Sequence, residues 1–143
     1  MPIFAEQSRE EMRRFYLEAW RKHKERAVLE PLEVQIAAVI ADHPEYIPLI
    51  ESGEGALHQE FSPESGHVNP FAHMALHQAL RDQVATDRPP GVAREYQRLM
   101  KKLGEAHEAE HAMGSVLAEL IWESVHNSSN PDMGQYVERL RRL

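Results

Sequence analysis

The chain of 143 residues contains no cysteine, so it can form neither a disulfide framework nor a thiolate metal site. It has no apolar run long enough to span a bilayer, and its first residues lack the basic and apolar regions of a secretory signal. We therefore expect a cytoplasmic protein that does not bind a membrane. The length fits one domain over residues 1–143, which can bury a core without cross-links.

Positive charge is also scarce, because the formal net charge is −7 with the nine histidines counted as neutral. The two basic runs, residues 21–26 and 139–142, are short and interrupted. Contacts with phosphates need clustered lysine and arginine side chains. We therefore expect that nucleic acid is not a partner.

No segment shows the sustained alternation of apolar and polar residues that is typical of a strand, so the sequence predicts no sheet. Helix signals recur along the chain, and the connections between them are short. The fold class is therefore predicted to be all-α, a bundle of about five to seven helices. Helix starts are indicated by the capping box of Ser8 and Glu11, by Pro31, by Asn69-Pro70 and by Asn130-Pro131.

Apolar residues at helical spacing indicate which faces are buried. In the second predicted helix, Leu32 and Ile36 are expected to face inward together with Val39 and Ile40. The long helix over residues 105–126 carries a comparable run of apolar residues: Met113, Val116, Leu117, Leu120, Ile121 and Val125. Residues 62–69 are predicted to form a loop.

Two of the histidine groups have a spacing that suits metal binding. His73 with His77, and His107 with His111, are four residues apart on predicted helices, which places both rings of a pair on one face. The other five histidines are isolated and are interpreted as surface or capping residues: His23, His43, His58, His67 and His126.

The order of the helices suggests that the two pairs meet. The helices over residues 69–86 and 105–126 are separated by one helix and two tight turns, so they are expected to run parallel. Each pair lies within the first two turns of its helix, which would place four imidazoles at one level. This arrangement predicts a divalent metal bound by His73, His77, His107 and His111, with zinc as first choice and nickel, iron or manganese as alternatives.

A structural interpretation of the same histidines stays open. The rings could bond to buried carbonyls or to carboxylates such as those of Glu60, Glu108 and Glu110. The protein would then be a non-enzymatic interaction domain, with Phe71 or Trp122 on a partner surface. A homodimer is compatible with both interpretations, and the sequence identifies neither a protein partner nor a small-molecule substrate.

The segment His-Glu-Ala-Glu-His at residues 107–111 matches two short metalloprotease patterns, in which Glu108 or Glu110 would activate a metal-bound water. Enzymes of that type align their substrate on a sheet, and no sheet is predicted here. A metal-dependent hydrolase or transferase is kept as a minor alternative. A di-iron pattern would pair Glu108 and His111 with Glu64 and His67, but the second pair lies in the predicted loop.

Four ordered motifs resemble a family of short, mainly proteobacterial helical proteins that is known only as a domain of unknown function. They are His-Pro-Glu-Tyr at residues 43–46, Asn-Pro-Phe-Ala-His at 69–73, Asp-Arg-Pro-Pro-Gly at 87–91, and the segment at 107–111. The paired histidines are more distantly similar to those of DinB-like bundles, in which three histidines hold a divalent metal. Those bundles use one pair and one separate histidine, whereas this chain has two pairs.

Overall fold

The computed structural model describes residues 2–61 and 69–143, with residues 2–7 described by their backbone only. Every regular element in these ranges is a helix, which confirms the all-α prediction. Eight α-helices are described, against the five to seven expected, because α3 and α4 have five residues each. The elements are α1 (Pro2–Lys24), α2 (Pro31–Ala41), the 3-10 turn η1 (Pro44–Tyr46), α3 (Ile47–Glu51), α4 (Glu54–His58), α5 (Pro70–Thr86), α6 (Val92–Leu103), α7 (Ala106–His126) and α8 (Met133–Arg141).

The helices divide into two compact units, Met1–Gln78 and Ala79–Leu143. The first holds α1 to α4 and the start of α5, and the second holds the rest of α5 with α6 to α8. The single domain expected over residues 1–143 stays a prediction. No helix in the described ranges combines the length and the apolar character that crossing a bilayer requires.

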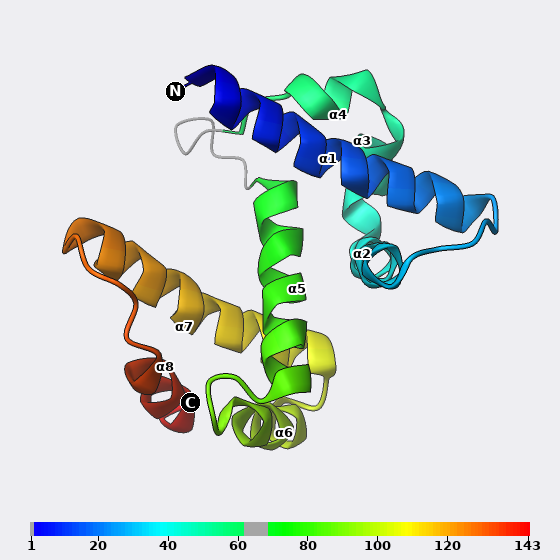
Figure 1. The fold of residues 1–143 in the computed structure, drawn as a ribbon. Helices are drawn as coiled ribbons and strands as arrows, with labels where there is room; N and C mark the ends of the chain where they lie inside the picture. The colour runs from blue at the N-terminus through cyan, green and yellow to red at the C-terminus, as the bar shows by residue number, and fades with distance from the viewer. Residues whose placement is uncertain (1, 62–68) are drawn as a thin grey trace. The chain divides into compact units, whose positions relative to one another are not determined.

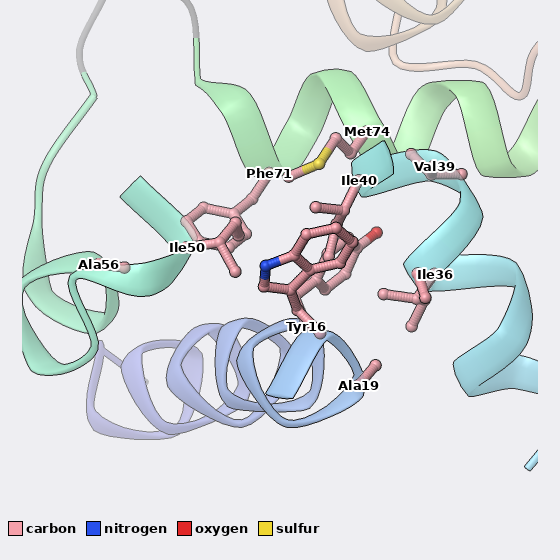
Figure 2. Packing of buried hydrophobic residues seen from close by; sticks show 11 residues of the cluster. Tyr16, Ala19, Ile36, Val39, Ile40, Ile50, Ala56, Phe71 and Met74 are labelled. Atoms are coloured by element: carbon pink, nitrogen blue, oxygen red, sulfur yellow. The ribbon is translucent and has the colours of Figure 1, made fainter. Parts of the chain in front are cut away.

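In the first unit, α1 packs against α2, α3 and α4 (Figure 1). Tyr16 projects from α1 into a core that α2 and the start of α5 complete (Figure 2). Trp20 of α1 belongs to the same core. The Tyr16 ring meets Phe71 edge-on, with ring centroids 5.8 Å apart. Burial of this aromatic and aliphatic surface provides the main driving force for folding of the unit. The buried residues of this core are Tyr16, Ala19, Trp20, Ile36, Ala37, Val39, Ile40, Ile50, Ala56, Phe71 and Met74.

A buried arginine ties α1 to the end of α4. The side chain of Arg13 is 1% exposed, and its Nη1 donates hydrogen bonds to the carbonyl oxygens of Ala56, Leu57 and Gln59 at 3.1, 3.3 and 2.8 Å. Its guanidinium carbon lies 4.9 Å from the centre of the Phe71 ring. Burial lowers the pKa of Arg13, and the nearby Arg9 lowers it further. The charge is tolerated because carbonyl oxygens and an aromatic face replace water.

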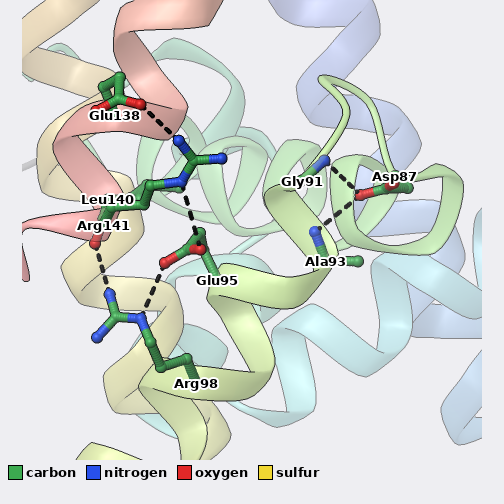
Figure 3. A network of polar contacts seen from close by, with 8 residues as sticks. All are labelled: Asp87, Gly91, Ala93, Glu95, Arg98, Glu138, Leu140 and Arg141. Atoms are coloured by element: carbon green, nitrogen blue, oxygen red, sulfur yellow. Dashed lines mark hydrogen bonds and ion pairs between the residues drawn. The ribbon is translucent and has the colours of Figure 1, made fainter.

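The second unit is held together by polar contacts as well as a core (Figure 3). Arg98 of α6 bonds to the buried Glu95 carboxylate at 2.9 Å and to the Leu140 carbonyl oxygen at 2.7 Å, which links α6 to α8. In the turn before α6, the Asp87 carboxylate accepts hydrogen bonds from the backbone N–H groups of Gly91 and Ala93. Gly91 has a φ of +97°, a conformation that favours glycine. One of the two tight turns that were expected between the helices over residues 69–86 and 105–126 lies here and is thereby confirmed.

Two predicted helix starts are wrong. Because α1 begins at Pro2, Ser8 lies inside the helix and does not cap it. Proline suits the first turn of a helix, because a backbone N–H at that position would have no partner within the helix. A start at Pro2 therefore competes with the capping pattern at Ser8, which then falls inside the helix. The last helix is capped by Asp132, whose side chain accepts from the N–H groups of Gly134 and Gln135, and not by Asn130. The starts at Pro31 and Pro70 are confirmed.

Three positions expected in the core are exposed: Leu32, Ile121 and Val125. Each continues a helical stripe whose other members are buried, such as Ile36 on α2 and Leu117 on α7. Helical spacing identifies an apolar stripe, but the stripe is buried only where another element covers it. Conversely, Phe71 is buried, so its predicted place on a partner surface is wrong, whereas Trp122 is exposed.

Candidate metal centre

The first histidine pair lies at the start of α5. The Asn69 side chain caps this helix by accepting from the backbone N–H groups of Phe71 and Ala72 at 3.0 and 3.2 Å. His73 and His77 follow one turn apart, and their Nε2 atoms are 3.0 Å from each other. That separation fits an N–H···N hydrogen bond. It is also close to the separation of two ligands of one tetrahedral zinc ion, which lie about 3.3 Å apart when each is about 2.0–2.1 Å from the metal.

A third histidine joins this pair within the first unit. His43, which follows α2, is 2% exposed, and its ring centroid lies 5.1 Å from that of His73 and 4.6 Å from that of His77. Ligand atoms of His43 and His77 come within 4.8 Å of each other. His43 is therefore neither isolated nor at the surface, although it does stand at the N-cap position of η1. Its neighbours in the fold are about thirty residues away in the sequence, a distance that helical spacing does not detect.

The orientation of the His43 ring is set by its own helix. Its Nδ1 lies 2.8 Å from the carbonyl oxygen of Val39, one turn earlier. Since a carbonyl oxygen can only accept a hydrogen bond, Nδ1 carries the proton and the ring lone pair resides on Nε2. Ligating histidines commonly have this arrangement, in which the second ring nitrogen donates to a carbonyl and fixes the tautomer.

Tyr46 lies against the same group. Its ring is stacked on that of His43, with centroids 5.6 Å apart and planes 5° from parallel, and it meets His73 edge-on at 5.8 Å. Burial raises the pKa of the Tyr46 phenol, and the neighbouring Glu45 carboxylate raises it further. We refer to His43, His73 and His77 as the three-histidine cluster.

The second histidine pair lies in the second unit, within the first two turns of α7. The ring centroids of His107 and His111 are 4.3 Å apart, and ligand atoms of the two rings lie within 4.8 Å of each other. The prediction that i, i+4 spacing brings these two rings together is confirmed. The prediction that both pairs hold the same ion stays a prediction.

The two carboxylates between His107 and His111 have different surroundings. Glu110 is buried, and its two carboxylate oxygens accept hydrogen bonds from the Arg81 Nε at 3.1 and 3.3 Å. Both groups line a small cavity of about 160 Å³ together with Tyr96, whose pKa is raised by burial and then by Glu110. Glu108 is exposed. Glu110 is thus engaged in a partly buried ion pair with Arg81, which leaves Glu108 as the better candidate for a general base.

The remaining histidines have ordinary roles where the structure describes them. His23 stacks on Trp20, with ring centroids 5.1 Å apart, and His126 bonds to the carbonyl oxygen of Trp122 at 3.0 Å. His58 is exposed and lies near two carboxylates of Glu10 and Glu54. His67 and Glu64, which the di-iron pattern would need, lie outside the described residues.

The comparison with family models supports the resemblance that the motifs indicated. Residues 8–142 match the model of a family described as a domain of unknown function (DUF1841). Neither a curated protein nor a solved structure matches the chain. The similarity to DinB-like bundles and the proteobacterial origin stay expectations.

Proposed function

We propose that this chain, which belongs to the DUF1841 family, is a divalent-metal-binding helical protein. The single observation that supports the proposal most is the three-histidine cluster. Three imidazoles from two separate elements lie together in the first unit, and two of them are almost fully buried. Imidazole nitrogens that are gathered in this way can bind one divalent ion together, and the binding free energy then adds to the stability of the fold.

The chemistry of the donors favours zinc. Imidazole nitrogen suits zinc, copper, iron and nickel, and a site without cysteine lacks the thiolates that copper(I) and iron–sulfur clusters prefer. Zinc also binds in a tetrahedral arrangement, with either four protein ligands or three protein ligands and a water molecule. We infer zinc as first choice, with nickel, iron or manganese as alternatives, and keep His107 and His111 as further ligands to the same ion or to a second one.

The number of protein ligands decides whether catalysis is feasible. Three histidines would leave a fourth position for water, which a metal ion could activate for hydrolysis or transfer. At an ion held by His107 and His111 with open positions, Glu108 of the same helix could act as the base. Four or more protein ligands would close the site and favour a structural metal. Whether the protein is an enzyme therefore depends on the coordination number of the bound ion.

Removing one member of the cluster tests the proposal. In a zinc titration with a competing chelator, His77→Ala is expected to bind at least about 100-fold more weakly than the wild type, because even loss of an outer-shell partner commonly costs 10- to 100-fold. The matched control is His58→Ala, an exposed histidine of the same unit, which should bind like the wild type. Equal affinity of His77→Ala and the wild type would contradict the ligand assignment.

An interaction domain is the second candidate, and one observation favours it. Ile121, Trp122 and Val125 form an exposed apolar patch on α7, with 44%, 60% and 69% of their surfaces accessible. Patches of this kind on helices often contact other proteins. In that case the histidines would be structural, and the chain would take up no metal.

A further inference from the structure

The motif at residues 43–46 forms a short turn that begins at His43. Pro44 begins η1, directly after α2 and His43, and its ring suits the first turn of a helix. The backbone N–H of Tyr46 donates to the carbonyl oxygen of His43 at 2.9 Å. This hydrogen bond folds the chain back on itself, so that the Tyr46 ring lies almost parallel to the His43 ring.

The same ring also reaches the other element of the cluster. Tyr46 contacts His73 of α5 edge-on, with centroids 5.8 Å apart and planes at 73°. One aromatic side chain therefore touches two of the three imidazoles, and these two belong to segments thirty residues apart. Tyr46 is also partly buried against the core of the first unit, which restricts its own rotamers.

We propose that Tyr46 is a positioning residue of the metal centre, whose ring holds His43 and His73 in the orientation in which they bind the ion. The inference rests on the proposed metal binding. An imidazole that rotates freely loses conformational entropy when it coordinates a metal, and packing that fixes the ring beforehand removes this cost. His43 is fixed at Nδ1 by Val39 and on its face by Tyr46, whereas the edge contact with Tyr46 orients His73.

This role belongs to the ring and not to the hydroxyl group, which gives a specific test. Zinc affinity would be measured by chelator competition for the wild type, Tyr46→Phe and Tyr46→Leu. Tyr46→Phe keeps both ring contacts and is expected to bind within about twofold of the wild type. Tyr46→Leu loses them and is expected to bind about 10- to 100-fold more weakly, the usual effect of removing an outer-shell partner.

A spectroscopic readout separates positioning from general destabilisation. Cobalt(II) in place of zinc gives an absorption spectrum that depends on the geometry of its ligands, and this spectrum should change in Tyr46→Leu but not in Tyr46→Phe. Leu49→Ala is the control, because Leu49 packs on the same core but, as an aliphatic side chain, provides no ring to stack on the histidines. It should lower the stability of the metal-free protein but leave the cobalt spectrum unchanged.

Each result decides between the alternatives. Wild-type affinity and an unchanged spectrum in Tyr46→Leu would overturn the positioning role while the proposed metal binding stands. An equal loss in Tyr46→Phe and Tyr46→Leu would assign the effect to the hydroxyl group and also overturn it. A wild-type chain that binds neither zinc nor cobalt would overturn the proposed function and the positioning role together.

Discussion

Replacing His43 by phenylalanine is expected to abolish the stabilisation of the protein by zinc while leaving its fold intact. Phenylalanine keeps a flat ring in the buried position and can still stack on Tyr46. It has no nitrogen, so it can neither ligate an ion nor bond to the Val39 carbonyl oxygen. We expect the metal-free variant to lose about 1 kcal/mol of stability, the usual contribution of one hydrogen bond.

Unfolding in urea with and without zinc measures this prediction. At a free zinc concentration 100-fold above the dissociation constant, the wild type should gain about 2.7 kcal/mol of unfolding free energy. The His43→Phe variant should gain close to none at the same concentration. His23→Phe provides the matched control, since His23 is an exposed histidine of the same unit that stacks on Trp20. A wild-type gain in His43→Phe would remove His43 from the ligands.

Replacing Arg13 by methionine is expected to destabilise the first unit by about 3 kcal/mol. Methionine fills a similar volume but donates no hydrogen bond, so the carbonyl oxygens of Ala56, Leu57 and Gln59 lose a buried donor. Each buried polar group left without a partner costs about 1–3 kcal/mol. The gain from an apolar side chain in the core offsets part of that cost, which is why the expected sum is moderate.

The fluorescence of Trp20 can report unfolding of the first unit when the second tryptophan of the chain, Trp122, is changed to phenylalanine. In this background Arg13→Met should shift the urea midpoint strongly downward. The neighbouring Arg14 has an exposed side chain with one ion pair at 3.8 Å, so Arg14→Met should change stability by less than about 0.5 kcal/mol. Equal effects of the two variants would show that the buried hydrogen bonds of Arg13 contribute little.

The helices could be predicted well from the sequence because their signals are local. Pro31, Pro70 and the glycine at 104 mark helix ends through their own backbone preferences, which do not depend on distant residues. Burial was predicted less well, as Ile121 and Val125 show, because it depends on which element covers a stripe. Arg13 shows the converse, because this charged residue is buried. Its guanidinium donates hydrogen bonds to carbonyl oxygens that are distant in the sequence, such as that of Gln59.

The candidate site was predicted in part for the same reason. The spacing of His73 with His77, and of His107 with His111, brought each pair together on its helix. His43 and Tyr46 were not recognised, because their contacts with His73 join segments thirty residues apart. A signal was nevertheless present, since the motif at residues 43–46 places a histidine and a tyrosine on either side of a proline-led turn.

The most direct test of the proposed function is the metal content of the wild-type chain, measured by mass spectrometry after purification without an affinity tag or a chelator. We predict about one divalent ion per chain, with zinc the most abundant, since a buried imidazole site retains its metal during purification. Two ions per chain would assign His107 and His111 to a separate site. Protein that is free of metal and takes up no added zinc, nickel, iron or manganese would contradict the proposal and favour the interaction domain.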